Sequence, residues 1–257
     1  MSKGVFFCVG TGGHVLPVLN IIKTISKKGI NESDMLVITD KRGEQYFSDS
    51  SLEIITYPFV SSTKGILGYF FKMFKIVISV FVIFKRLRKL NISFIFTTGA
   101  YIAPVAAVLS VMLRTKFYIQ EQNIFAGLGN KVSAFRANSV FTSFPNTENI
   151  SQKKIDFSGP VLNLDVEKIR ENSNSNITIG FQGGSQGSKE INDLAIEFAK
   201  DPIYENIKII HIVGKSHNSS TINRKNYVSY DFIENMDNYY DSINIQVSRA
   251  GGGSLEA

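Results

Sequence analysis

Three glycines and a histidine, Gly10, Gly12, Gly13 and His14, lie close together near the start of the chain. A strand-like apolar run precedes them, and a helix-like apolar pattern follows them. Glycine has no Cβ atom, so a turn of this composition lets backbone N–H groups and the positive end of a helix dipole approach an anion. The segment therefore predicts a site for a phosphate or diphosphate beside an imidazole.

A second glycine-rich segment, GGSQGS at residues 183–188, follows the strand-like run NITIGFQ. A helix-like run, KEINDLAIEFAK, comes next, and the strand-like run IKIIHIVG follows it. The order of strand, glycine turn and helix thus occurs in both halves of the chain, without any further sequence repeat. Two such domains face to face would bring two helix N-termini that attract anions to one cleft.

Gly10 and Gly12 could also begin the dinucleotide-binding pattern G-x-G-x-x-G, but Val15 stands at the third glycine position. Asp40, the candidate for a ribose-binding acid, lies farther along the chain than the usual distance of about 20 residues. Neither glycine segment has the lysine spacing of a P-loop. A nicotinamide-dependent dehydrogenase and a P-loop nucleotidase are both disfavoured.

The first 160 residues alternate strand-like and helix-like runs, which is the pattern of a parallel sheet covered on both faces. The strand-like runs are VFFCV, MLVIT, LEIITY, ISFIFTT, KFYIQ and SVFTSF. The polar stretch EKIRENSNSN, which ends at residue 176, marks a linker or the entry to a second domain. We expect an α/β protein with Rossmann-like domains over residues 1–160 and 161–257.

The composition indicates a globular chain, because 44% of its 257 residues are hydrophobic and can form a core in each of two modest domains. The single cysteine, Cys8, cannot form an internal disulfide, and its apolar neighbours predict a buried thiol. The first residues lack the long apolar run of a signal peptide, so we expect a cytoplasmic protein. The formal charge of +6 favours anionic partners, but no zinc-finger spacing, RNP-type motif or basic heptad region predicts a nucleic acid.

Residues 63–91 combine aromatic, apolar and basic side chains. Lys72 and Lys75 interrupt the apolar run, so the uninterrupted stretch of about 20 residues that crosses a bilayer is missing. A long core helix is one interpretation of this segment. The mixture of aromatic residues and lysines, followed by the run KRLRK at residues 85–89, also indicates contact with an anionic membrane surface. We expect peripheral membrane binding and no transmembrane helix.

Six short motifs follow one another along the chain. They are GTGGHVLPVLNI (10–21), TTGAYIAPVAAV (97–108), EQNIFAGLGNK (121–131), GGSQGSKEIN (183–192), DFIENM (231–236) and SRAG (248–251). In this order, and over essentially the whole chain, they resemble the MurG family of peptidoglycan N-acetylglucosaminyltransferases, in glycosyltransferase family 28. The resemblance implies a B-type glycosyltransferase fold, with two Rossmann-like domains facing a cleft and the second domain incomplete.

The resemblance also implies an activity in bacterial cell wall synthesis. N-acetylglucosamine would pass from UDP-N-acetylglucosamine to undecaprenyl-diphospho-N-acetylmuramoyl-pentapeptide with inversion, which converts lipid I to lipid II. The enzyme would be peripheral, at the cytoplasmic face of the bacterial cell membrane. The first domain would bind the acceptor and the membrane, and the second would bind the UDP-sugar.

The two glycine segments acquire roles from this resemblance. Thr11, Gly12 and Gly13 match a loop that contacts the donor, and the same region is expected to face the acceptor diphosphate. His14 matches the catalytic-site histidine: direct displacement with inversion needs a base for the acceptor hydroxyl proton, and an imidazole accepts protons near neutrality. Ser185 matches the serine that binds the donor diphosphate, where a helix N-terminus stabilises anions.

Further positions match site residues of the family. Glu121 matches a catalytic position, and Ile233 matches the position whose backbone holds uracil. The other substrate-binding matches are Tyr101, Asn123, Asn130, Asn192 and Arg249. By chemistry alone, the matches in the first domain could equally be loop or capping residues, and His14 could be a capping or packing histidine. The UDP-sugar is a substrate, and neither a cofactor nor a metal is expected.

The chain departs from the family pattern at several positions. Gln120 stands where the family usually has a histidine, and Leu162 replaces an arginine that contacts the donor. Ala257 stands where the family has its ribose-binding glutamate, and a typical member continues beyond it with the glutamine pair of the sugar site. We therefore expect a C-terminally truncated donor domain, weak UDP binding and slow or absent transfer by this chain alone.

Two other functions are compatible with the sequence. The glycine loops are shared more widely than the substrate, so a related glycosyltransferase with another lipid acceptor is one alternative. A non-catalytic, membrane-associated subunit that needs a partner's donor domain is the other. Binding of UDP-N-acetylglucosamine, without binding of UDP-glucose or UDP-galactose, would favour the transfer of N-acetylglucosamine to lipid I over both alternatives.

Overall fold

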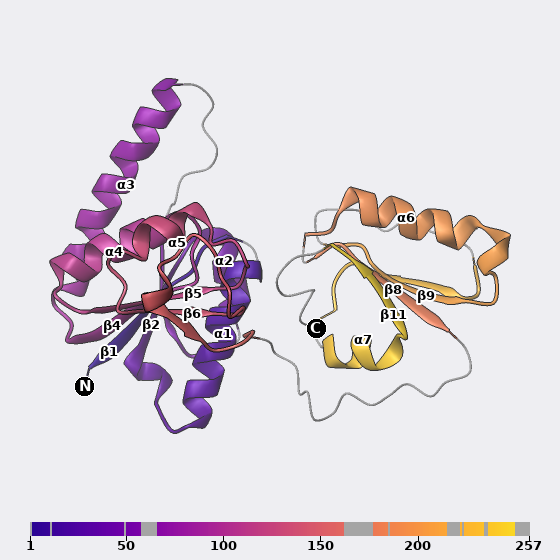
Figure 1. The fold of residues 1–257 in the computed structure, drawn as a ribbon, viewed down its shortest axis with the longest axis horizontal. Coiled ribbons are helices and arrows are strands. Elements are labelled where there is room, and N and C mark those ends of the chain that lie inside the picture. The colour runs from indigo at the N-terminus through magenta and orange to yellow at the C-terminus, as the bar shows by residue number, and fades with distance from the viewer. Residues whose placement is uncertain are drawn as a thin grey trace. The chain divides into compact units, whose positions relative to one another are not determined.

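The computed structural model divides the chain into two compact units, Met1–Val161 and Leu162–Ala257 (Figure 1). It describes residues 2–10, 12–48, 50–57, 66–161, 177–184, 186–214, 222, 224–233 and 236–249, and residues 66–75 by their backbone alone. Each unit is built around one parallel sheet, of seven strands in the first and four in the second. The chain is therefore an α/β protein, as the alternating runs predict.

The first unit contains the seven-stranded sheet. Its strands are β1 (Lys3–Phe7), β2 (Met35–Thr39), β3 (Glu53–Thr56), β4 (Ile92–Thr97), β5 (Lys116–Glu121), β6 (Ser139–Thr142) and β7 (Ile155–Phe157). The strand order is β3-β2-β1-β4-β5-β6-β7, and Phe7 of β1 pairs with Ile38 on one side and Thr97 on the other. The first six strands overlap the six predicted runs, whereas β7 lies outside them.

Helices cover both faces of this sheet (Figure 1). They are α1 (Gly12–Lys27), α2 (Lys41–Glu44), α3 (Ile66–Leu87), α4 (Ala103–Met112) and α5 (Leu128–Ser133). Successive strand residues point to opposite faces, so Phe7 packs with Leu87 of α3 and Leu109 of α4, while Phe6 packs with Val18 of α1. Short 3-10 helices lie at Glu32–Asp34, Gln45–Phe47, Ala100–Ile102, Gln152–Lys154 and Pro202–Tyr204.

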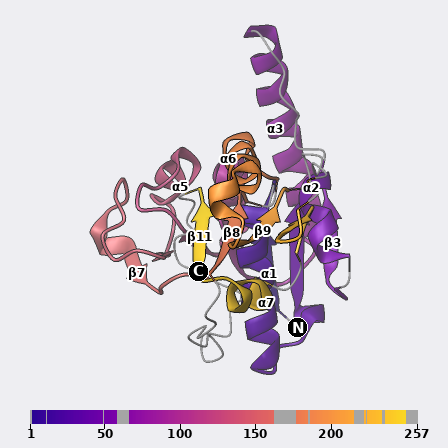
Figure 2. The same ribbon diagram turned by 90° about the vertical axis from the view of Figure 1, so that its right-hand side faces the viewer.

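The long helix α3 covers most of the basic and aromatic segment that the sequence singles out. Figure 2 shows its first turns extending beyond the other helices of the first unit. Its last turns pack on the sheet through Ile83 and Leu87, which are 2% and 0% exposed. Among the helices that the structure describes, none is both long enough and apolar enough to cross a bilayer.

The second unit contains the four-stranded sheet, in the order β10-β9-β8-β11. Its strands are β8 (Thr178–Gln182), β9 (Lys208–Ile212), β10 (Tyr227–Tyr230) and β11 (Ile245–Ser248). The helix α6 (Lys189–Lys200) packs on one face beside Phe181, and α7 (Met236–Ser242) packs on the other beside Ile212. The predicted strand, glycine turn and helix that open this half are therefore β8, residues 183–188 and α6.

Candidate functional site

The carboxyl ends of β1, β4 and β5 lie side by side in the first unit, because these strands are parallel neighbours. The chain proceeds from β1 to β2 and β3 on one side, and then places β4 on the other side of β1. In open parallel sheets, ligands bind outside the carboxyl ends at such a reversal of strand order. Residues 8–10, 12–14, 98–101 and 122–130 therefore surround the expected site.

His14 lies in the first turn of α1 and is half-buried. Its Nδ1 lies 3.0 Å from the carbonyl oxygen of Thr98, and the Thr98 hydroxyl donates to the His14 carbonyl at 2.6 Å. A carbonyl oxygen can only accept, so Nδ1 carries a proton, and in the neutral imidazole Nε2 keeps the lone pair. The first hydrogen bond thus orients the ring, and the second holds the backbone of His14.

A proline inside α1 connects this helix to the loop after β5. Pro17 has no N–H group, so the carbonyl of Gly13, four residues earlier, lacks its usual helical partner. The side-chain amide of Gln122 donates to that carbonyl instead. Gly13 is exposed, and apart from its chain neighbours and the backbone of its own helix no described atom lies within 4 Å of the point where a Cβ would stand. The first turn of α1 is therefore held from the β5 side and remains open to solvent.

Glu121 is the last residue of β5 and is 3% exposed. One carboxylate oxygen accepts from the backbone and side-chain N–H groups of Asn123, at 2.9 and 3.0 Å. The other oxygen accepts from the Gly127 N–H at 3.0 Å and from the Asn130 side chain at 2.9 Å. Glu121 therefore fixes the shape of the loop that leads into α5.

Asn130 joins the loops that follow β4 and β5. Its side chain is buried, at 3% exposure, and its Nδ2 also approaches the Gln120 carbonyl at 3.4 Å. A Cβ on Gly99 would stand 2.7 Å from this nitrogen, and Gly99 has a φ of +103° that favours glycine. The contact between these loops therefore depends on glycine at position 99.

A buried carboxylate, Asp40, stands at the carboxyl end of β2 and is 4% exposed. Its Oδ1 accepts from the backbone N–H groups of Gly10 at 3.1 Å and Gly43 at 2.9 Å. Its Oδ2 accepts from Arg42 Nε at 3.1 Å, from Arg42 Nη2 at 2.8 Å, and from the Tyr101 hydroxyl at 3.3 Å. Asp40 thus connects the first glycine loop to the ends of β2 and β4.

These contacts determine the ionisation of the cluster. Burial alone would raise the pKa of Asp40, but the hydrogen bonds from Gly10, Arg42 and Gly43 and the Arg42 charge outweigh burial and lower the pKa below its ordinary value. Burial and the charge of Asp40 raise the pKa of Tyr101 to about 12, so the phenol keeps its proton at neutral pH. The carboxylate is therefore ionised and the phenol is neutral.

The structure brings most of the predicted residues of the first unit to one edge of the sheet, and Thr11 lies outside the described residues. The residues at this edge are Gly12, Gly13, His14, Tyr101, Glu121, Asn123 and Asn130. The sequence did not identify four of their neighbours: Asp40 as part of this site, Arg42, Thr98 and Gln122. The available signal was position, because Asp40 directly follows the strand MLVIT.

The second glycine segment is held by close backbone packing. A Cβ on Gly183 would stand 2.2 Å from the Ser188 nitrogen, and a Cβ on Gly214 would stand 2.1 Å from the Gly187 nitrogen. Gly214 also has a φ of +94°. The loops after β8 and β9 thus approach so closely that side chains are excluded between them. The predicted residues Ser185, Leu162 and Ala257 lie outside the described residues.

Asn192 is a predicted site residue of the second unit and is 7% exposed. Its Nδ2 donates to the Val213 carbonyl at 3.0 Å, and its Oδ1 lies 3.0 Å from His211 Nε2. An amide oxygen only accepts, so Nε2 carries the proton and the Tyr227 hydroxyl donates to Nδ1 at 2.7 Å. Burial lowers the pKa of His211 to about 4, so this imidazole is neutral at neutral pH. The Asn192 side chain thus bonds within the second unit.

Ile233 and Arg249 are the other predicted residues of the second unit. Ile233 is half-buried and packs against the apolar cluster beneath α7. Arg249 is exposed after β11. The hydrogen bond from Ser188 is the main cause that lowers the pKa of Glu190, and the Arg249 charge adds to it. Arg249 therefore lies near enough to the start of α6 to act on an anion there.

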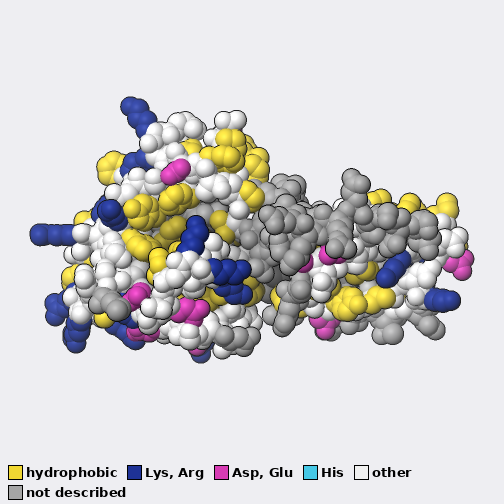
Figure 3. Space-filling view, turned by 90° about the horizontal axis from the view of Figure 1, so that it is seen from below, with side chains coloured by type: hydrophobic (Ala, Val, Ile, Leu, Met, Phe, Trp, Pro, Cys, Tyr) yellow, Lys and Arg dark blue, Asp and Glu magenta, His cyan; other side chains and the backbone are white. Residues whose placement is uncertain are grey.

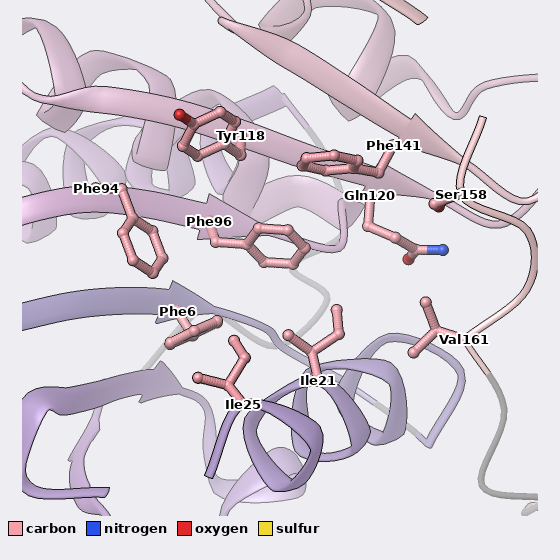
Figure 4. Close-up of a pocket in the computed structure, with 10 residues that line it drawn as sticks. All are labelled: Phe6, Ile21, Ile25, Phe94, Phe96, Tyr118, Gln120, Phe141, Ser158 and Val161. Carbon is pink, nitrogen blue, oxygen red and sulfur yellow. The ribbon is translucent and has the colours of Figure 1, made fainter. Parts of the chain in front are cut away.

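An apolar cavity of about 340 Å³ lies between α1 and the sheet of the first unit, on the face opposite α4 (Figure 4). It is lined by Phe6, Ile21, Ile25, Phe94, Phe96, Tyr118, Gln120, Phe141, Ser158 and Val161. Viewed from below, this unit shows hydrophobic side chains at its surface among lysines and arginines (Figure 3). In the described ranges, no three His, Cys, Asp or Glu side chains come together as metal ligands.

Two family models match the chain. The glycosyltransferase family 28 N-terminal domain matches residues 5–142, and the glycosyltransferase family 28 C-terminal domain matches residues 178–256. The two models therefore cover both units of the structure.

Two bacterial relatives carry the name UDP-N-acetylglucosamine–N-acetylmuramyl-(pentapeptide) pyrophosphoryl-undecaprenol N-acetylglucosamine transferase. The relative from Borreliella burgdorferi is 30% identical over 99% of this chain and 73% of its own length. The relative from Sulfurihydrogenibium is 28% identical over 96% of this chain and 71% of its own length.

A solved structure is also similar to the chain. The crystal structure of MurG from Acinetobacter baumannii matches with a TM-score of 0.69 and 22% identity, over 99% of this chain and 75% of that one. At this identity the similarity shows a shared fold, and this fold is the B-type glycosyltransferase fold that the sequence predicts.

Proposed function

The chain belongs to glycosyltransferase family 28, and from this membership we propose that it transfers N-acetylglucosamine from UDP-N-acetylglucosamine to undecaprenyl-diphospho-N-acetylmuramoyl-pentapeptide. The names of the relatives, at 28% and 30% identity, support this donor and acceptor. The product would be the lipid-linked disaccharide of peptidoglycan synthesis.

The fixed imidazole of His14 is the observation that carries the proposal. Its Nδ1 donates to the Thr98 carbonyl at 3.0 Å, so Nε2 is the nitrogen through which the neutral imidazole would act as a base. In the proposed step, the acceptor hydroxyl gives its proton to Nε2 as its oxygen bonds to the anomeric carbon. The bond from that carbon to the UDP oxygen breaks on the opposite face, which inverts the configuration. UDP leaves with the electron pair.

Glu121 contributes to this proposal through the loop that it holds. Both of its oxygens accept hydrogen bonds from Asn123, Gly127 and Asn130. The carboxylate would therefore fix Asn123 and the start of α5 beside the imidazole, with Asn123, Asn130 and Tyr101 forming the acceptor side of the site. Preorganisation of this kind lowers the cost of orienting a substrate.

The donor would bind the second unit. Its predicted contacts are Ser185 for the diphosphate, the Ile233 backbone for uracil, and Asn192 and Arg249 nearby. The exposed Arg249 and the backbone N–H groups at the start of α6 favour an anion there. Because the Asn192 side chain bonds to Val213 and His211, it would support the loop and leave the donor contact to the backbone.

A transfer assay tests the proposal. The full gene product that contains residues 1–257 is incubated with radiolabelled UDP-N-acetylglucosamine and the lipid-linked acceptor, with UDP-glucose and UDP-galactose as matched donors. We expect labelled disaccharide from UDP-N-acetylglucosamine alone. Transfer to another polyprenyl-linked acceptor, but not to this one, would establish the related-transferase alternative. Donor binding without transfer to any acceptor would establish a non-catalytic subunit.

We also propose that α3 brings the protein to anionic membranes. Val77, Ile78, Phe81 and Val82 are 43–61% exposed on its described part, and the basic run at residues 85–89 follows them. Exposed apolar side chains beside basic ones suit the interface of an anionic bilayer. Each basic residue near the surface contributes about 1 kcal/mol, weakened by salt.

Co-sedimentation with vesicles tests this surface. Replacement of Lys85, Arg86, Arg88 and Lys89 by Gln should reduce binding to anionic vesicles strongly. A matched variant loses four exposed charges in the second unit, Lys189, Lys200, Lys208 and Lys225. Equal binding of the parent protein to neutral and anionic vesicles, or equal losses in the two variants, would contradict the proposal.

A further inference from the structure

We infer that Arg42 binds the diphosphate of the lipid-linked acceptor at the first glycine loop, and that Asp40 is the positioning residue that holds Arg42 against this loop. The inference rests on the proposed function for the identity of the acceptor. It assigns a role to Asp40 and Arg42 at the end of β2. Neither residue belongs to the predicted site or takes part in the proposed proton transfer.

Asp40 fixes the glycine loop. Its Oδ1 accepts the Gly10 N–H at 3.1 Å, across 30 residues of sequence, and the Gly43 N–H at 2.9 Å. Gly10 has a φ of +95°, a conformation in which side chains other than hydrogen are strained. One carboxylate oxygen therefore sets the path of the chain immediately before α1.

The other oxygen of Asp40 orients Arg42. Arg42 Nε and Nη2 donate to Oδ2 at 3.1 and 2.8 Å, which fixes the plane of the guanidinium. Its Nη2 lies 3.8 Å from the point where a Cβ on Gly10 would stand, and no other described atom outside the neighbouring residues is as near. The guanidinium is thus packed against the glycine loop.

Arg42 nevertheless presents its charge to solvent. The Arg42 side chain is 61% exposed, whereas the Asp40 side chain is 6% exposed. A guanidinium has five N–H donors in a planar fork; Asp40 accepts from two of its nitrogens, and the Tyr101 hydroxyl also hydrogen-bonds with the guanidinium. The remaining donors suit the oxygens of a diphosphate, which a guanidinium binds in parallel pairs. The ion pair is therefore asymmetric, with its anion inside the fold and its cation at the mouth of the loop.

The same asymmetry makes the inference testable without unfolding the protein. An ion pair with so exposed a cation contributes less than the buried hydrogen bonds of Asp40, so Arg42→Gln should leave the fold intact. Arg114 is an exposed arginine just before β5, at the end of the sheet opposite the glycine loop, and Arg114→Gln removes the same charge. These two variants separate a placed cation from a general loss of charge.

The probe is farnesyl diphosphate, a prenyl diphosphate that has no sugar, peptide or nucleotide. Calorimetric titration of the full gene product should show that Arg42→Gln weakens its binding about tenfold or more, because a charge-assisted hydrogen bond is lost. Arg42→Lys should restore only part of this loss, since an ammonium lacks the planar fork. Arg114→Gln should bind it nearly as the parent protein does.

Titration with UDP separates the two possible sources of the diphosphate. We expect the dissociation constant of UDP to be the same in Arg42→Gln and the parent protein. An equal loss for UDP and farnesyl diphosphate would overturn the assignment to the acceptor. Unchanged binding of farnesyl diphosphate by Arg42→Gln, or an equal loss in Arg114→Gln, would overturn the role of Arg42.

The positioning role of Asp40 needs a readout that a general loss of stability does not move. Asp40→Asn should weaken the binding of farnesyl diphosphate about as much as Arg42→Gln does. The double variant should weaken this binding no further, because the two residues act as one unit. Additive losses would contradict the positioning role. Binding of farnesyl diphosphate is measured without sugar transfer. The role of Arg42 and the proposed transfer activity can therefore be contradicted separately.

Discussion

The two glycine loops follow the same order of strand, turn and helix, but they are held in different ways. In the first unit, side chains from neighbouring strand ends hold the loop: Asp40 binds Gly10, Thr98 binds His14 and Gln122 binds Gly13. In the second unit, glycines hold the loop, because Gly183 and Gly214 allow backbone atoms to approach where a Cβ would clash. The first loop is therefore held mainly by side chains of other strand ends, and the described part of the second mainly by close backbone packing.

This difference separates two uses of one local structure. A loop bordered by an imidazole, a carboxylate and a guanidinium can move protons and orient anions. A loop of closely packed backbone can bind an anion through N–H groups but offers no base. Under the proposed function, the side chains that neighbouring strands contribute would give the first loop its chemistry, and the glycine turn alone would not.

The largest effect on stability should come from filling the backbone contact of the second loop. Gly214→Ala should lower the free energy of unfolding by about 3 kcal/mol, through steric overlap with Gly187 added to backbone strain. Gly184 is the matched control, since its φ is +89° but no described atom outside the neighbouring residues lies within 4 Å of its Cβ position. Gly184→Ala should cost only about 1 kcal/mol. Equal losses in urea unfolding would show that close packing does not hold this loop.

The first loop should instead respond to removal of a charge. Asp40→Asn should lower the free energy of unfolding by about 2 kcal/mol, because the five hydrogen bonds to the carboxylate lose their charged acceptor. The pKa of Asp40 is lowered in the fold, so its contribution is present at neutral pH and is lost as the pH falls below its ordinary value of 3.8.

A surface carboxylate provides the control for Asp40. Glu53 forms exposed ion pairs with Lys3 and Arg86, and Glu53→Gln should cost less than about 1 kcal/mol. Faster amide exchange at Gly10 and Gly43 in Asp40→Asn would locate the loss at the loop. Unchanged exchange at these two amides would contradict the account of how the first loop is held.

The second unit should carry the pH dependence of stability in weak acid. The pKa of His211 falls from 6.5 to about 4 on folding, so the unfolded chain binds more protons between these values and stability decreases as the pH falls. The loss between pH 7 and pH 5 should be about 2 kcal/mol. In His211→Gln, urea unfolding at the two pH values should differ much less. A variant with the same pH dependence as the parent protein would assign the effect to another group.

The smallest effect should come from one hydroxyl at the first loop. Thr98→Val removes the donor to the His14 carbonyl but keeps the Thr98 carbonyl that fixes the imidazole, so it should cost about 1 kcal/mol and slow transfer modestly. Thr24→Val is the control, because the Thr24 hydroxyl bonds only within an exposed turn of α1. Equal transfer rates in the two variants would show that this hydroxyl does not position His14.

The sequence predicted the elements whose apolar pattern is continuous or periodic. All five residues of β2 are buried, and the run MLVIT predicts them as a strand covered on both faces. The amphipathic run KEINDLAIEFAK coincides with α6. The strand β7 was missed because it has only three residues, two of them exposed, and forms through backbone pairing with β6.

The residue types of the candidate site could be predicted from the sequence, but the contacts that these residues make could not. Glycines and a histidine before a helix-like run predicted the first loop. The contact between His14 and Thr98 joins residues 84 positions apart, and that between Gly10 and Asp40 joins residues 30 positions apart. Both contacts arise because β1 lies between β2 and β4 in the sheet. The local hydrophobic periodicity of a sequence does not predict the order of its strands.

The most direct test of the account is the His14→Ala variant of the full gene product, with sugar transfer and UDP affinity measured on the same sample. The central claim is that the first loop supplies the base and the second binds the donor. We expect transfer to fall about 100-fold or more, as for loss of a general base, with unchanged UDP affinity and thermal unfolding. Full transfer activity, or a loss of UDP affinity that matches the loss of transfer, would contradict this division of roles.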